Sequence, residues 1–128
     1  MKQLVLVLAA LASPLACADT HRQVLDQLVL AAGSGASAAQ GERLFRMKSD
    51  HGEAASCSAC HTDDPKAAGR HVRTHKAIEP LAPVANPARF TDTAKVEKWF
   101  GRNCKEVLDR ACSAQEKADF AAYMISVR

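Results

Sequence analysis

Apolar residues recur three and four positions apart in several segments of the chain, which is the spacing of helices with one buried face. Three segments open with the Ser/Thr-x-x-Glu/Gln pattern that caps a helix start, at Thr20, Ser37 and Ser113. The first stops at the glycine-rich stretch 33–35, and the last runs to the chain end. Their apolar stripes are Val24, Leu25, Leu28 and Val29, then Leu44 and Phe45 beside Gly41, and finally Phe120, Tyr123, Met124 and Val127.

A fourth helix is predicted after a proline-rich stretch. Three prolines between 78 and 87 exclude a helix there, and the stretch lacks the alternation of a strand, so we expect an extended loop. Thr91 or Thr93 can then cap a helix that reaches Asn103 or beyond. No segment carries a strand pattern, so the expected fold class is all-α, with one domain and long loops.

The first 18 residues have the composition of a leader. Lys2 precedes an apolar run over 4–12, and Ala16-Cys17-Ala18 resembles a small-x-small cleavage site. The run is too short to span a bilayer as a helix. We therefore expect a secretory signal peptide at 1–18 and a mature domain at 19–128, located in the periplasm of a bacterium. Lipidation of Cys17 is the alternative, although Pro14 and Leu15 make a poor lipoprotein signal.

Charge excludes one class of partner. The chain has 17 Lys and Arg residues against 14 Asp and Glu residues, and its formal charge of +3 falls to +2 when Lys2 leaves with the leader. No basic block is dense enough to indicate a nucleic-acid partner.

The chemistry is concentrated in Cys57-Ser58-Ala59-Cys60-His61, which has the C-x-x-C-H spacing of c-type haem attachment. Each cysteine sulfur can add to one haem vinyl group, and the imidazole of His61 can bind the iron from the proximal side. A thioredoxin-like dithiol would not need the histidine, and a zinc site would need a second ligand pair at similar spacing. We therefore interpret the motif as the attachment site of one haem c, which would form much of a small core.

Two further cysteines, Cys104 and Cys112, remain in the mature chain. An even number of remaining thiols in an oxidising compartment favours a disulfide, with two free thiols as the alternative. The loop that it closes would be nine residues long. Closing it would stabilise the fold by roughly 2.6 kcal/mol in the chain-entropy account.

The sixth position on the iron has two candidate ligands on predicted helices. Methionine is the usual partner in an electron carrier, but Met124 lies on the apolar stripe of the last helix, where core packing explains it. Asn103 shares a helix face with Trp99 and Phe100, so its amide oxygen could bind iron. An asparagine at this point could instead end the helix as a C-cap.

His71 and His75 are further candidates. They lie four residues apart among basic residues, which indicates an exposed basic patch. One of them could still act as an iron ligand, and the patch could serve as a docking face for a redox partner or be an ordinary solvated loop. The cations concerned are Arg70, Arg73 and Lys76.

Two long motifs add a family resemblance. The first is Gly41-Glu42-Arg43-Leu44-Phe45 ahead of C-x-x-C-H, with an aromatic last helix, which resembles class I cytochromes c. The second runs from Ile78-Glu79-Pro80-Leu81-Ala82-Pro83 through 86–92 to Trp99-Phe100-Gly101-Arg102-Asn103-Cys104, and on to Cys112 and 116–119. Together they resemble the sphaeroides haem protein family of oxygen-binding monohaem cytochromes c, over nearly the whole mature chain.

The resemblance implies a class I cytochrome c fold, with helices packed around one covalently bound haem and Gly41 packed against an aromatic of the last helix. It implies His61 as proximal ligand, Asn103 as distal ligand and a Cys104–Cys112 disulfide. It further implies that the asparagine leaves the iron on reduction and that the ferrous haem then binds O2, NO or CO. The implied electron donor is a cytochrome, such as a dihaem cytochrome c linked to a membrane cytochrome b.

The residues support the same hypothesis on chemical grounds. An amide oxygen is a hard, neutral and weak ligand that suits ferric iron better than ferrous iron, so reduction should weaken the Asn103 bond. A simple electron carrier with no physiological gas ligand is the alternative, and no residue near Asn103 points to an enzyme. Segment 70–75 is one residue longer than the family's loop and contains His71 and His75. One of these histidines could therefore compete with Asn103 for the iron.

Overall fold

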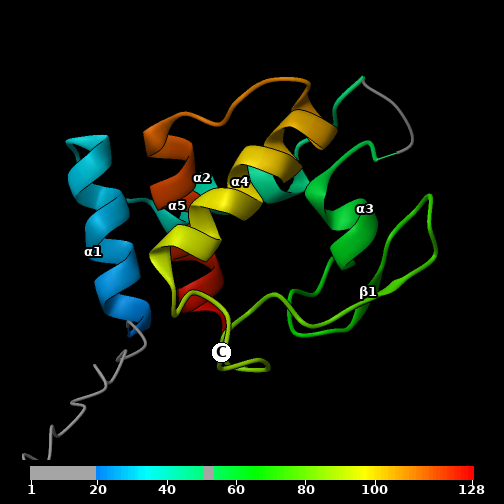
Figure 1. Ribbon diagram of the computed structural model, residues 1–128, viewed down its shortest axis with the longest axis horizontal. Helices are drawn as coiled ribbons and strands as arrows, with labels where there is room; N and C mark the ends of the chain where they lie inside the picture. Colours follow the sequence, from blue (N-terminus) through cyan, green and yellow to red (C-terminus); the bar gives the residue numbers. More distant parts are fainter. Residues whose placement is uncertain (1–19, 51–53) are drawn as a thin grey trace, which may run out of the picture.

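The computed structural model describes residues 20–50 and 54–128, so the expected signal peptide at 1–18 and the Cys17 alternative lie outside the described residues. The described chain is mostly helical, as predicted (Figure 1). Its helices are α1 (His21–Ala32), α2 (Ala38–Arg46), α3 (Cys57–His61), α4 (Thr93–Leu108) and α5 (Ala114–Ser126). None of them is long and apolar enough to cross a membrane.

The expectation of no strands is wrong in one place. β1 (Gly69–Arg70) and β2 (Ala77–Ile78) form an antiparallel hairpin in which Gly69 pairs with Ile78. Each strand has only two residues, which is too short for an alternating pattern to be visible in the sequence. The hairpin lies next to α3 (Figure 1).

The three predicted helix starts are confirmed by their caps. Thr20 and Ser113 each form a full capping box, in which the third residue of the helix returns a hydrogen bond to the cap N–H. Ser37 accepts from the Gln40 N–H, but its own N–H donates to the Asp119 carboxylate at 2.7 Å. Because Asp119 is buried on α5, the start of α2 is fixed by the last helix as well as by its own first turn.

The core is built where α2 crosses α5. Gly41 lies at the crossing, and a Cβ at this position would lie 2.0 Å from the backbone oxygen of Asp119 and 2.9 Å from the nitrogen of Phe120. Glycine therefore allows the two backbones to touch. Beside this contact, the ring of Phe45 packs against Phe120 and Tyr123, with centroids 6.2 and 5.8 Å apart. The contact of the glycine with the aromatic helix, which the resemblance implied, is confirmed.

The start of α4 differs from the prediction. Asp92 is the N-cap, with its carboxylate accepting a backbone N–H of the first turn at 2.9 Å, whereas Thr91 and Thr93 were expected to cap. A carboxylate also suits the positive end of the helix dipole. The helix continues past Asn103, and Asp109 ends it in the left-handed conformation.

Three side-chain contacts attach α4 to the last helix and the segment before it. The ring of Phe100 meets Phe120 edge-on, with centroids 5.6 Å apart. Lys117 donates to the Glu97 carboxylate at 2.5 Å. The predicted Cys104–Cys112 disulfide is confirmed, with Cα atoms 5.6 Å apart, and joins the last third of α4 to the segment that leads into α5.

Replacing Gly41 by alanine should lower the free energy of unfolding by about 3 kcal/mol or more, because the new methyl would overlap backbone atoms of α5. Urea unfolding of the holoprotein, followed by far-UV circular dichroism, measures the change. Gly101→Ala is the matched control, since its new Cβ would meet no atom within 4 Å. Alanine is a better helix former than glycine, so Gly101→Ala should leave the free energy of unfolding unchanged or raise it by about 1 kcal/mol. Equal stability of the two variants would contradict the close crossing.

Glu116 predicts a dependence of stability on pH. Its pKa is held below the ordinary value, mainly by hydrogen bonds from Arg110, whose guanidinium donates to both carboxylate oxygens at 2.7 and 2.8 Å. Because the pKa of Glu116 is lower in the folded state than in the unfolded state, the ionised carboxylate stabilises the fold at pH values above its unfolded-state pKa. This stabilisation is lost as the pH falls through the folded-state pKa. Glu116→Gln should therefore lower the free energy of unfolding at pH 7 and have a smaller effect below pH ~4.

The control for this variant is Glu42→Gln. Glu42 pairs with Arg46 one turn away at 3.1 Å, and its side chain is 47% exposed, so its loss should change stability by less than about 0.5 kcal/mol at any pH. Urea unfolding at a series of pH values compares the two. An effect of Glu116→Gln that stays constant from pH 7 to pH 3 would argue against the ion pair as its cause.

Candidate functional site

The C-x-x-C-H motif forms the single-turn helix α3. Buried Ser56 caps it, with its hydroxyl accepting a backbone N–H of the turn at 3.0 Å. Cys57 and Cys60, three positions apart and both free thiols, lie on neighbouring positions of one turn. The helix ends at His61, because Thr62 leaves the helical conformation with a positive φ of 62°. The three residues of the motif are thus presented together by one short, capped turn.

Burial determines the protonation of this turn. It raises the pKa of Cys57 to about 11, with a smaller contribution from Cys60. It lowers the pKa of His61 to about 4, and the positive charge of Arg89 lowers it further. A neutral imidazole has the lone pair that binds a metal. A protonated Cys57 disfavours the dithiol-redox interpretation, which needs a reactive thiolate.

The hairpin supports the turn from one side. A Cβ at Gly69 would lie 2.1 Å from the Cys60 carbonyl oxygen and 3.0 Å from the Cα of His61. Such an approach is open only to glycine. The position of two of the three motif residues therefore depends on the close packing of β1 against α3.

The proline-rich loop has no helix, as predicted, and it is fixed to the segment that follows the motif. The N–H groups of Leu81 and Ala82 both donate to the carbonyl of Pro65, each at 2.9 Å. Pro65 and Ala82 are buried. The loop thus closes over the chain four residues after His61.

Arg89 is a residue of this region that the sequence reasoning missed. Its Nε and Nη2 donate to the carbonyls of Pro80 and Glu79 at 3.0 and 2.9 Å. These bonds hold a half-buried guanidinium close enough to His61 to lower the pKa of the imidazole. A single arginine in an otherwise apolar, proline-rich segment was the signal that could have identified it.

Asn103 lies in the interior of α4, where its side chain is exposed. The C-cap alternative is therefore wrong, since Asp109 fills that position. In the described structure the Asn103 amide has no hydrogen-bond partner. One turn earlier, Trp99 is 43% exposed and stacks with the guanidinium of Arg102, 5.7 Å from the ring centroid. This part of α4 presents a partly exposed aromatic ring, next to an exposed amide with no hydrogen-bond partner among the described residues.

Two rival iron ligands are engaged elsewhere. Met124 is fully buried in the cluster around Phe45, which confirms the core-packing interpretation. His71 was expected in an exposed patch, but its side chain is only 22% exposed and its Nε2 lies 3.1 Å from Glu106. His75 is exposed in the turn of the hairpin, with φ of 57°. The patch interpretation thus holds for His75 but not for His71.

The donor set fits a covalently bound haem. It combines two free thiols on one turn, a neutral imidazole at its end and, on α4, a partly exposed indole. Among residues 20–50 and 54–128, no group of three His, Cys, Asp or Glu side chains is arranged to hold a metal ion unaided. This arrangement gives no support to the zinc alternative.

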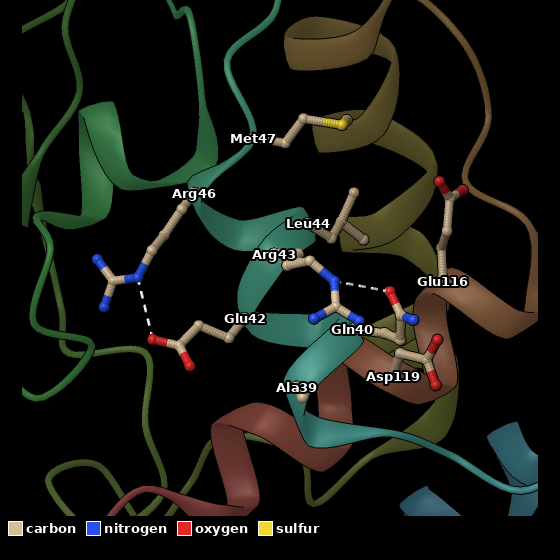
Figure 2. Close-up of a pocket in the computed structure, with 9 residues that line it drawn as sticks. All are labelled: Ala39, Gln40, Glu42, Arg43, Leu44, Arg46, Met47, Glu116 and Asp119. Atoms are coloured by element: carbon tan, nitrogen blue, oxygen red, sulfur yellow. Dashed lines mark hydrogen bonds and ion pairs between the residues drawn. The ribbon is translucent and has the colours of Figure 1, made fainter.

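A hollow of about 710 Å³ lies elsewhere, beside α2 (Figure 2). Side chains of 39–47 line it together with Glu116 and Asp119 of α5. Two of its arginines are held within α2, Arg43 by Gln40 at 3.0 Å and Arg46 by Glu42 at 3.1 Å (Figure 2). No residue of the C-x-x-C-H motif lines this hollow, so it is separate from the candidate haem site.

Comparison with known proteins places the chain among c-type cytochromes. Residues 31–124 match a family described only as a domain of unknown function, DUF1924. The chain is 43% identical to the cytochrome c-type protein SHP of Cereibacter sphaeroides over 127 residues, which covers 97% of this chain and 98% of SHP. It is also 43% identical over 81 residues to cytochrome c'' of Methylophilus methylotrophus, covering 63% of this chain and 56% of the relative.

Solved structures give the same result. Oxidized SHP, described as an oxygen-binding cytochrome c, superposes with a TM-score of 0.79 at 45% identity, covering 85% of this chain and 99% of that structure. Oxidized cytochrome c'' from Methylophilus methylotrophus superposes with a TM-score of 0.73 at 35% identity, covering 83% and 93%. The predicted fold of a monohaem cytochrome c is thereby confirmed.

Replacing Gly69 by alanine should reduce haem loading by severalfold, because the new methyl would overlap the Cys60 carbonyl and displace the turn that carries the motif. The ratio of haem to polypeptide in purified protein, from the pyridine haemochrome spectrum, measures the effect. Gly35→Ala is the control, since no atom lies within 4 Å of its new Cβ. Full loading of the Gly69 variant would show that α3 does not depend on the hairpin.

Proposed function

The chain belongs to the DUF1924 family and is a c-type cytochrome homologous to SHP, and from this premise we propose that it is an exported monohaem protein that binds a diatomic gas after reduction. The haem would supply an iron that changes oxidation state and has a sixth position for O2, NO or CO. The gas-binding part of the proposal rests on SHP, which is described as oxygen-binding, and on the character of Asn103.

We assign the attachment of the haem to Cys57 and Cys60. Each S–H would add across one vinyl group of the haem, forming a C–S bond and passing its hydrogen to the neighbouring carbon. His61 would bind the iron. Its low pKa supports this role, because the imidazole is neutral throughout the physiological range.

We assign the distal position to Asn103. The observation that carries this assignment is an exposed amide in the middle of α4, with no hydrogen-bond partner among the described residues and beside a partly exposed Trp99, while Met124 is fully buried in the core. A neutral amide oxygen is a weak ligand that suits ferric iron better than ferrous iron, so reduction would favour release of the Asn103 side chain. The released amide N–H2 can then donate a hydrogen bond to the gas.

The surroundings of Asn103 limit its movement. The next residue, Cys104, is bonded to Cys112, so this point of α4 stays attached to the segment before α5. Trp99 and Phe100 of the same helix would supply the apolar part of the distal pocket. Release of Asn103 is therefore expected to involve its side chain and the local helical turn, with no displacement of the whole helix.

We propose further that the protein works in the periplasm and receives its electron from a cytochrome. The leader-like residues 1–18 and the disulfide support the compartment. The donor proposal, a dihaem cytochrome c linked to a membrane cytochrome b, rests on the family resemblance. Lys76, an exposed cation of the hairpin turn, is available to an acidic donor, whereas Arg73 lies 3.7 Å from Glu106.

Asn103→Ala should convert the ferric haem from a low-spin to a high-spin or water-bound form, because the distal amide is lost. Optical spectra of ferric, dithionite-reduced and CO-treated protein measure this. The unaltered protein should be low-spin when ferric, become five-coordinate on reduction and bind CO. Lys98→Gln, an exposed change on the same helix, should leave all three spectra unaltered.

Two results would contradict the proposal. An unchanged ferric spectrum in the Asn103 variant would exclude Asn103 as the ligand. A reduced wild-type spectrum that stays six-coordinate and does not respond to CO would indicate a strong sixth ligand, and hence a simple electron carrier.

A further inference from the structure

The turn of the hairpin is connected to the helix that carries Asn103 through one carboxylate. Glu106 of α4 accepts from His71 Nε2 at 3.1 Å, and Arg73 Nη2 lies 3.7 Å from the same oxygen. The Glu106 side chain is 30% exposed and that of His71 22%, so water only partly competes for this contact. The two residues are 35 positions apart in the chain.

The bonds to His71 indicate how the proton is placed. The backbone N–H groups of Arg73 and Thr74 both lie 3.2 Å from Nδ1, which must therefore carry the lone pair. Nε2 then carries the hydrogen and donates it to the Glu106 carboxylate. The neutral ring satisfies both of its nitrogens, which fixes its orientation. A hydrogen bond to a charged acceptor is among the stronger ones in proteins.

Glu106 lies where it can affect Asn103. It is three positions further along α4, which places the two residues on neighbouring positions of one turn. Cys104, in the same turn, points to the opposite side and is bonded to Cys112. The turn 103–106 is therefore held on two sides, by the disulfide and by His71.

The other end of this connection reaches the motif. Two residues before His71, Gly69 packs against the backbone of Cys60 and His61. A short path of contacts thus runs from the proximal ligand through the hairpin to the turn that carries the proposed distal ligand. His71 and Glu106 are the side chains that close the path.

We propose that His71 and Glu106 form a positioning pair, which holds the turn 103–106 at a fixed place relative to α3 and so favours the Asn103-bound state of ferric iron. This inference rests on the proposed function of Asn103. It gives His71 a role other than iron ligand or docking cation. It also predicts that loss of the pair loosens the distal side while the proximal side stays intact.

The test compares ferric His71→Ala and Glu106→Ala with the unaltered holoprotein. Each should shift the equilibrium from Asn103-bound to unbound iron by about tenfold, as expected for one hydrogen bond to a charged group. The low-spin fraction, from optical and electron paramagnetic resonance spectra, measures this shift. Hydrogen exchange of the backbone amides 103–108 gives a second, independent readout and should become faster in both variants.

Three controls make the result specific. Glu106→Gln keeps an acceptor oxygen and should shift the equilibrium less than Glu106→Ala. His75→Asn alters the other histidine of the turn, which is exposed, and asparagine accepts its positive φ; it should change neither readout. In an Asn103→Ala background, His71→Ala should still accelerate exchange in α4 but cause no further change of spin state.

The possible failures are distinguishable. If Asn103→Ala changes the ferric spectrum and His71→Ala does not, the positioning role is wrong while the ligand assignment stands. If Asn103→Ala itself leaves the spectrum unchanged, the proposed function fails and the inference falls with it. If His75→Asn acts as strongly as His71→Ala, the effect belongs to the turn as a whole and the pair has no special role.

Discussion

The backbone contact between α2 and α5 at Gly41 is the constraint on which the rest of the structure depends. It fixes where α2 ends, and the segment after α2 leads directly to the haem-binding motif. The two ends of that segment are tied by the Ser49 N–H, which donates to the Ala55 carbonyl at 2.6 Å. A change in the angle of α2 on α5 would therefore be transmitted to α3. No side chain larger than hydrogen at position 41 is compatible with this arrangement.

The two sides of the site are held by different kinds of contact. On the side of His61, backbone contacts fix the position of α3 and the loop beside it, through the packing of Gly69 and the hydrogen bonds to the Pro65 carbonyl. On the side of α4, side chains hold the site, through one aromatic pair, one ion pair, the hydrogen bond between His71 and Glu106, and a disulfide. Side-chain contacts can break and re-form without unfolding the chain. This asymmetry suits a site with one permanent ligand and one ligand that leaves.

Much of the site could be predicted from the sequence because its chemistry is local. The spacing of Cys57, Cys60 and His61 is set by covalent and metal-ligand geometry within five residues, and cap chemistry is confined to one helical turn. The start of α4 could not be chosen, since Thr91, Asp92 and Thr93 can all cap. The folded chain uses Asp92, two residues after Phe90, which is buried and has a φ of 56°.

What escaped prediction depends on contacts between distant segments. The sequence alone predicts an ordinary loop glycine at position 69, and only the structure shows that it packs against α3. Likewise, the sequence predicts a surface histidine at position 71, and only the structure shows its contact with Glu106. The role of Asn103 as helix end or helix interior likewise depended on where α4 stops. Such contacts have no local signature, although the family resemblance indicated the disulfide and the glycine contact correctly.

The pairing of α2 with α5 also has a consequence for the order of events during synthesis. Residue 41 meets residue 119, so the core cannot close until residue 119 has been made. Contacts between segments so far apart form late in folding. Under the proposed export and haem attachment, the thiols of α3 would therefore be accessible in an open chain before α2 and α5 close, and closure could follow attachment.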